Sequence, residues 1–235
     1  MSEAAVATVR RDAEQGQAVA ALRRTMVERQ LRPFDVTDVP LLERFMNVPR
    51  ELFLPESQAD LAYSDLAVSL KGAGRMLLPP LVLARLLQGA SPREGEKVLD
   101  IGGGGYPAAL LSGLVGEVVS LESDPEIAAR AKAGLAAIGA SNAQVETGPM
   151  QNGFPGAGPY DVIYIHGAVE ADLEPLFAQL KPEGRLLAIV TPENGAGRQV
   201  VRFERNEGKP AGKVSLLSAN APVLEGFAKA PAFSF

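Results

Sequence analysis

Acidic and glycine residues follow one another at the end of an apolar run near the middle of the chain. The run ends at Asp100, and a cluster of glycines begins two residues later: Gly102, Gly103, Gly104 and Gly105. Glycine has no Cβ and adopts positive φ at little cost, so this cluster can turn sharply and let a ligand lie against bare backbone. Pro107 suits the first turn of a following helix, where its missing N–H costs nothing. The pattern predicts a strand–turn–helix nucleotide site at the carboxyl edge of a sheet.

Two carboxylates favour S-adenosylmethionine over a dinucleotide as the ligand of this site. Asp100 would repel a pyrophosphate placed on the helix N-terminus, whereas it would attract the ammonium of the methionine moiety. Glu122 ends the next predicted strand, where a carboxylate can accept both ribose hydroxyls. An acid at this place also occurs in NAD sites, so Glu122 discriminates little by itself. The order acid, glycines, helix, strand, acid indicates a cofactor site formed by Asp100, the first three glycines and Glu122.

His166 ends a third predicted strand, at the edge of the sheet where ligands bind. It could contact the substrate or cofactor, or act as a base if the acceptor is a hydroxyl or an amine. The alternative is a hydrogen-bonded histidine in the pocket wall. The sequence does not identify a catalytic residue.

The composition of the chain limits the classes of function. The chain has 235 residues, 46% of them hydrophobic, and a formal net charge of −5, so nucleic acid is an unexpected partner. It has no cysteine and one histidine, which excludes disulfides, thiolate nucleophiles and a multi-histidine metal site. No apolar run approaches the ~18 residues of a membrane span, and the N-terminus has no apolar signal core. We therefore expect a cytoplasmic protein without metal, membrane or nucleic-acid partners.

Alternating strand and helix patterns must position these residues. We expect strands over residues 97–101, 117–122, 143–147, 160–166 and 185–191, with helices beginning near Pro107, Pro125 and Leu173. Such alternation indicates a parallel sheet wrapped by helices. Residues 199–205 and 213–217 read as a terminal antiparallel hairpin, which suits a class I methyltransferase. Residues 71–74 read as a loop.

The expected fold is α/β: a Rossmann-like class I methyltransferase fold with a mostly parallel twisted sheet, a C-terminal antiparallel hairpin and N-terminal helices. We expect a single domain over 1–235. It comprises an N-terminal helical region (1–95), a cofactor-binding core (96–195) and a C-terminal hairpin and tail (196–235).

Four further segments carry a resemblance to a known family: MVERQL at 26–31, VPRELFLP at 48–55, DLAYSD at 60–65 and LKPEGRL at 180–186. Together with the glycine loop and Glu122, they make the chain resemble the protein-L-isoaspartate O-methyltransferases from about Met26 to the C-terminus. The resemblance implies S-adenosylmethionine as cofactor. It also implies methyl transfer to isoaspartyl carboxylates of damaged proteins or peptides, a protein-repair reaction.

Three ligand-facing segments depart from the family pattern. The glycine loop is one residue shorter than the acid-x-G-x-G-x-G-Y of the family. Leu78 stands where the family has an active-site serine, and Gly148-Pro149-Met150 lacks the acid of the family's Gly-Asp-Gly segment. Two alternatives to the repair enzyme therefore stay open. One is a member without catalysis that serves as a binding or assembly module, and the other is a methyltransferase for a different small acceptor.

Overall fold

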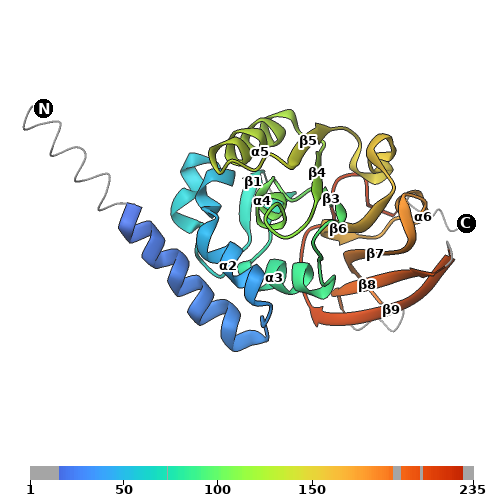
Figure 1. The fold of residues 1–235 in the computed structure, drawn as a ribbon, viewed down its shortest axis with the longest axis horizontal. Coiled ribbons are helices and arrows are strands. Elements are labelled where there is room, and N and C mark those ends of the chain that lie inside the picture. Colours follow the sequence, from blue (N-terminus) through green and yellow to red (C-terminus); the bar gives the residue numbers. More distant parts are fainter. Residues whose placement is uncertain (1–15, 73, 193–196, 207–208, 230–235) are drawn as a thin grey trace, which may run out of the picture.

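A seven-stranded sheet forms the centre of the computed structural model, which describes residues 16–72, 74–192, 197–206 and 209–229. The strand order is β5-β4-β3-β6-β7-β8-β9 (Figure 1). The first five strands pair in parallel, and the last two are antiparallel. Their bounds are β3 (Lys97–Ile101), β4 (Glu117–Glu122), β5 (Ala143–Thr147), β6 (Tyr160–Val169), β7 (Leu180–Val190), β8 (Gln199–Asn206) and β9 (Lys209–Ser218). The predicted Rossmann-like fold with a terminal hairpin is confirmed.

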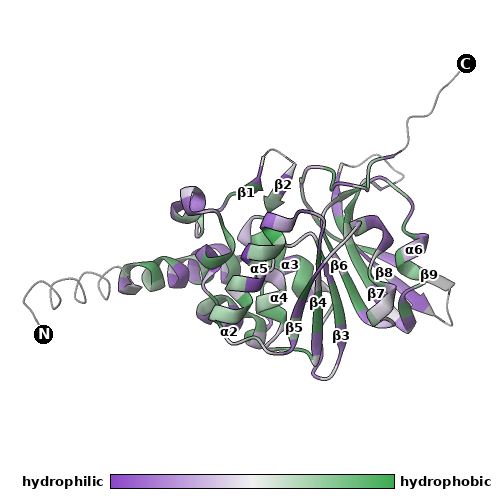
Figure 2. Ribbon diagram, turned by 90° about the horizontal axis from the view of Figure 1, so that it is seen from above, coloured by the Kyte–Doolittle hydropathy of each residue, from purple (hydrophilic) through white to green (hydrophobic). Residues whose placement is uncertain are grey.

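The buried strands separate two apolar layers, because successive side chains of a strand point to opposite faces. Val98 and Val118 belong to one cluster, which includes most of the helical side chains. Leu99 and Val119 belong to the other, together with Met150 and the C-terminal segment. Figure 2 shows the helices α2, α4 and α5 gathered on one side of the sheet and α6 on the other.

Two of the α-helices begin at an aspartate that caps the helix N-terminus. Asp38 accepts a hydrogen bond from Leu41 N–H at the start of α2 (Val39–Asn47). Asp124 accepts bonds from two backbone N–H groups at the start of α5 (Pro125–Ala137), as an N-cap carboxylate should. The other α-helices are α3 (Pro80–Gly89), α4 (Tyr106–Leu111) and α6 (Glu174–Phe177). A helix over residues 16–26 continues into the π-helix η1 (Val27–Leu31).

Short 3-10 helices connect these elements: η2 (Arg32–Phe34), η3 (Arg50–Phe53), η4 (Glu56–Leu61), η5 (Met150–Asn152) and η6 (Pro155–Ala157). The last two stand between β5 and β6, in place of a longer crossover helix.

Several expectations about local structure were incomplete, and the two largest differences concern residues 71–74 and the start of β7. The expected loop at 71–74 overlaps a strand, because Lys71 ends β1 (Val68–Lys71), which pairs in an antiparallel hairpin with β2 (Arg75–Leu77). The fifth parallel strand, β7, begins at Leu180 rather than 185. The hairpin matters because it stands beside the glycine loop.

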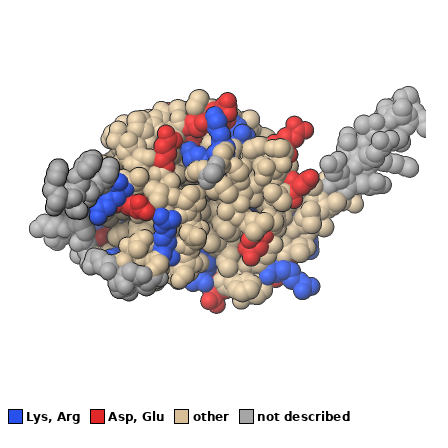
Figure 3. Space-filling model, turned by 180° about the vertical axis from the view of Figure 1, so that it is seen from behind, with Lys and Arg blue, Asp and Glu red and all other residues tan. Residues whose placement is uncertain are grey.

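The surface of the described residues carries mixed charge. On the face drawn in Figure 3, acidic and basic side chains are interspersed and most of the area is uncharged. Among the described helices, none is long and apolar enough to cross a membrane. The described part of the chain also brings together no group of three or more residues that could hold a metal ion.

Candidate cofactor site

The topology brings the six predicted site residues together at the carboxyl ends of β3, β4 and β6. Asp100 lies opposite Ser120 of β4 and Tyr164 of β6 in the parallel register. Glu122 ends β4, and His166 lies on β6 one residue past the pairing with β3. The glycines turn back over this edge, with Gly102 at φ +74° and Gly104 at φ +66°.

Glu122 is fully buried, and both of its carboxylate oxygens have partners. Its Oε1 accepts a 2.7 Å hydrogen bond from Gly104 N–H. Its Oε2 lies 2.5 Å from Nη2 of Arg75, on β2. Burial raises the pKa of Glu122, while Arg75 and the Gly104 N–H act to lower it. Arg75 also donates to Gly102 O, at 3.3 Å, so its guanidinium joins β4 to the glycine loop.

Asp100 is likewise buried and held by the protein itself. Its Oδ2 accepts a 3.1 Å hydrogen bond from Ser120 Oγ. Its Oδ1 lies 2.5 Å from Nε2 of His166, although the two groups are not aligned as a hydrogen bond. The His166 ring also stacks on Tyr164, with 6.2 Å between ring centroids. The sequence leaves open whether His166 has a functional or a structural role. In the structure, its ring lies against the carboxylate of Asp100.

Apolar side chains cover the glycines. A methyl group placed on Gly102 would lie 2.9 Å from a Leu224 methyl carbon and 3.3 Å from Met150 Sδ. One placed on Gly104 would lie 2.7 Å from a methyl carbon of Leu70, on β1. The backbone of Leu224 is fixed in turn, because its N–H donates to Ala168 O on β6.

The open space near the site lies to one side of the buried acids. A hollow of about 520 Å³ at the ends of β4 and β5 is lined by Ser123, Gly148, Pro149, Met150, Gln151, Glu225 and Gly226. A larger hollow of about 770 Å³ borders α6 and β8, where Phe177 and Phe203 line it. Neither is lined by Asp100, Glu122 or His166.

Two residues at this site, Arg75 and Leu224, were absent from the sequence prediction. The alternation of Val68, Ser69, Leu70 and Lys71 before a glycine-containing turn could have indicated the hairpin that carries Arg75. Leu224 follows the last strand in irregular structure, and nothing in its local sequence indicates that it returns to the glycine loop.

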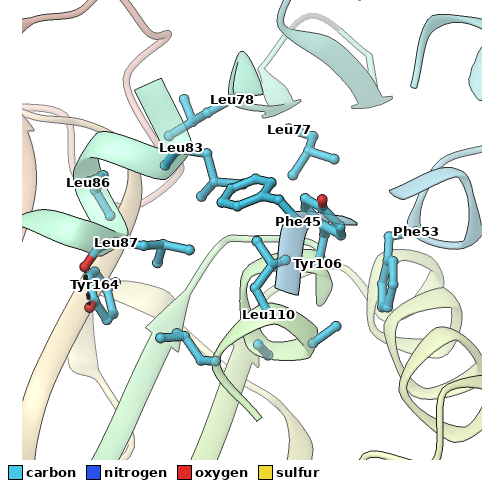
Figure 4. Packing of buried hydrophobic residues seen from close by; sticks show 14 of the residues in the cluster. Phe45, Phe53, Leu77, Leu78, Leu83, Leu86, Leu87, Tyr106, Leu110 and Tyr164 are labelled. Carbon is cyan, nitrogen blue, oxygen red and sulfur yellow. Dashed lines mark hydrogen bonds between the residues drawn. The ribbon is translucent and has the colours of Figure 1, made fainter. Parts of the chain in front are cut away.

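Leu78 is buried in the main apolar cluster, where Figure 4 shows it beside Leu83. Its carbonyl oxygen accepts a 2.8 Å hydrogen bond from the Arg50 guanidinium, which is itself fully buried and lies over the Tyr106 ring. Burial lowers the pKa of Arg50 to about 10. Leu78 therefore serves the packing of the core in this arrangement.

The sheet order, the terminal hairpin and the acidic residues at the ends of β3 and β4 define a Rossmann-like methyltransferase. The family model described as protein-L-isoaspartate(D-aspartate) O-methyltransferase matches residues 24–223. The chain belongs to this family of enzymes.

Named relatives agree with this assignment. A protein-L-isoaspartate O-methyltransferase of Rhodopseudomonas palustris is 38% identical over 187 residues, which span 79% of this chain and 76% of the relative. One of Ignicoccus hospitalis is 40% identical over 157 residues, 65% of this chain and 74% of the relative.

Solved structures agree as well. A protein-L-isoaspartate O-methyltransferase superimposes with a TM-score of 0.69 at 27% identity, over 86% of this chain and 67% of its own. A structure from Plasmodium falciparum, described as a complex with S-adenosyl-L-homocysteine, superimposes with a TM-score of 0.70. At 15% identity over 88% of this chain and 98% of its own, it shows the common fold alone.

The residue types at the site suit an adenosyl cofactor, but protein side chains occupy the space that the cofactor would need. Asp100 and Glu122 are acids at the places where an ammonium and ribose hydroxyls would need them. In the described arrangement, however, Arg75 pairs with Glu122, Ser120 donates a hydrogen bond to Asp100, and Leu70 and Leu224 fill the space against the glycines. S-adenosylmethionine therefore does not fit this arrangement of the site.

Proposed function

We propose that this chain is an S-adenosylmethionine-dependent protein-L-isoaspartate O-methyltransferase that esterifies isoaspartyl carboxylates in damaged proteins or peptides. The observation that carries the proposal is the family match over residues 24–223. The placement of Asp100, Gly102, Gly103, Gly104, Glu122 and His166 at one edge of the sheet supports it. A soluble cytoplasmic enzyme fits a substrate of this kind.

The acceptor needs little acid–base assistance. An isoaspartyl carboxylate is already an anion at neutral pH, so the protein has mainly to hold it in line with the methyl donor and to exclude water. The absence of a hydroxyl at Leu78 therefore removes a group that orients the acceptor rather than an essential base.

A labelled-methyl assay tests the proposal. The purified chain is incubated with S-adenosylmethionine and a peptide that contains one isoaspartyl residue, and incorporation is compared with that in the same peptide with an ordinary aspartyl residue. Methylation of the isoaspartyl peptide alone is the expected result. A family member with the complete motifs provides the positive control, and incorporation no greater than in a reaction without enzyme contradicts the proposal.

A second function has one specific observation in its favour. Glu122 is paired with Arg75, and leucine side chains cover Gly102 and Gly104. This arrangement favours a family member that keeps the fold without catalysis and serves as a binding or assembly module. The same assay separates the two, because such a module transfers no methyl group to either peptide.

A further inference from the structure

The covering of the cofactor site comes from two segments that are distant in sequence. The β1–β2 hairpin supplies Arg75 and Leu70, and the segment after β9 supplies Leu224. Ser123, which follows Glu122, connects them: it accepts a hydrogen bond from Arg75 and donates one to Glu225. The two segments thus meet at the carboxyl end of β4.

We infer that Arg75 and Leu224 act as an internal substitute for the cofactor, holding Glu122 and covering Gly102, so that the chain binds S-adenosylmethionine only when both are displaced. The inference rests on the proposed function, since it takes Glu122 to be the carboxylate that the cofactor would use. Arg75 therefore lowers the affinity of the chain for the cofactor, because it competes for Glu122.

The strength of the Arg75–Glu122 pair favours the closed arrangement. Arg75 is 7% exposed and Glu122 is fully buried. A charge-assisted hydrogen bond is roughly twice as strong as a neutral one, and ribose hydroxyls offer only neutral donors to the carboxylate. Displacing the guanidinium would also leave it without its carboxylate partner inside the protein, which is unfavourable.

Steric occupation acts in the same direction. Leu224 and Met150 lie against the face of Gly102 that has no side chain. The neighbouring hollow of about 520 Å³ is lined by Met150 and Gly148 but not by the glycine loop. A ligand could therefore reach the ends of β4 and β5 but not the backbone of Gly102.

Calorimetric titration with S-adenosylhomocysteine tests this inference without requiring catalysis. The proteins are the full-length wild type, Arg75→Ala, Leu224→Ala and the double variant. Arg185→Ala is the matched control for removing a buried arginine, because Arg185 is also 7% exposed and pairs with Glu96 away from the site. Leu176→Ala is the control for a new cavity, since Leu176 is buried in the same apolar cluster as Leu224.

The double variant is expected to bind at least about tenfold more tightly than the wild type, a difference of about 1.4 kcal/mol, while both controls bind like the wild type. Arg75→Gln, which keeps a hydrogen-bond donor, replaces Arg75→Ala if circular dichroism shows that the latter does not fold.

Equal affinity of the wild type and the double variant overturns the inference and leaves the proposed function standing. Absence of binding to every folded protein at millimolar ligand overturns the inference and also contradicts the cofactor of the proposed function. The same gain in the control variants would show that general loosening, rather than the removal of Arg75 and Leu224, admits the ligand.

Discussion

The buried pair of Arg75 and Glu122 makes the effect of one substitution depend on pH. Burial raises the pKa of Glu122, and the nearby Arg75 acts against this rise, so Arg75→Ala should raise the pKa of the folded state further. A carboxyl group with a raised pKa contributes stability below its unfolded value of about 4.3 and loses that contribution as pH rises through the folded value.

Arg75→Ala should therefore destabilise the protein by about 3 kcal/mol at pH 8, the order found for breaking a buried pair, and by less at pH 5. Urea unfolding of the variant and the wild type at the two pH values measures the difference. An equal loss at pH 5 and pH 8 would show that Glu122 does not take up a proton in the variant.

Two buried tyrosines differ in whether their hydroxyl has a partner. Tyr164 donates to Leu87 O at 3.0 Å (Figure 4), whereas the hydroxyl of Tyr106 has no hydrogen-bond partner among the described residues. Tyr164→Phe should cost about 1 kcal/mol, the net value of a buried hydrogen bond. Tyr106→Phe should be neutral or slightly stabilising, because it removes an unsatisfied polar atom. Denaturant titration compares them, and a larger loss for Tyr106→Phe contradicts the assignment.

At the scale of the elements, the turn from β3 into α4 needs a glycine for two reasons. Gly105 has φ +84°, and a methyl group there would lie 2.5 Å from Ala131 Cβ and 2.9 Å from Ala131 Cα in α5. Gly139, after α5, has φ +69° but open space around it.

Gly139→Ala should thus cost only the left-handed backbone penalty of about 1–2 kcal/mol. Gly105→Ala should cost about 1–3 kcal/mol more, the usual range for overpacking. Thermal unfolding of the two variants gives the comparison. Equal losses would mean that α4 and α5 separate easily to accommodate the methyl group.

The elements that the sequence predicts well are those with a strong local signal. The runs at 97–101, 117–122 and 143–147 are β3, β4 and β5 with unchanged bounds. The strands β3 and β4 are mostly buried apolar segments between turns, as parallel strands usually are, whereas β5 is an edge strand in which apolar and polar residues alternate. The same reasoning placed Asp100, Glu122 and His166 at one edge. It did not find Arg75 or Leu224 at this edge, since Arg75 lies 47 residues before Glu122 and Leu224 reaches Gly102 from beyond the last strand.

For the whole molecule, the apolar cluster on the helical side of the sheet runs through both the N-terminal region and the α/β core. Phe45 and Phe53 contact the Tyr106 ring, with centroids 6.1 and 5.8 Å away. Arg44 of α2 donates to the carbonyl oxygens of Ala109 and Leu110 in α4. These contacts support the prediction that the chain is a single domain rather than two units divided near residue 95.

Cutting the chain at that point tests the prediction. A fragment of residues 96–235 would expose the helical face of the sheet around Val98 and Tyr106, and it should show no cooperative unfolding transition. The full chain should unfold in one transition that is the same by fluorescence and by circular dichroism. Mixing the fragment with residues 1–95 is the control, since recovery of the transition shows that the missing core, rather than damage to the fragment, prevents folding. A fragment that unfolds cooperatively by itself would contradict the single domain, because its core would then be complete without the N-terminal helices.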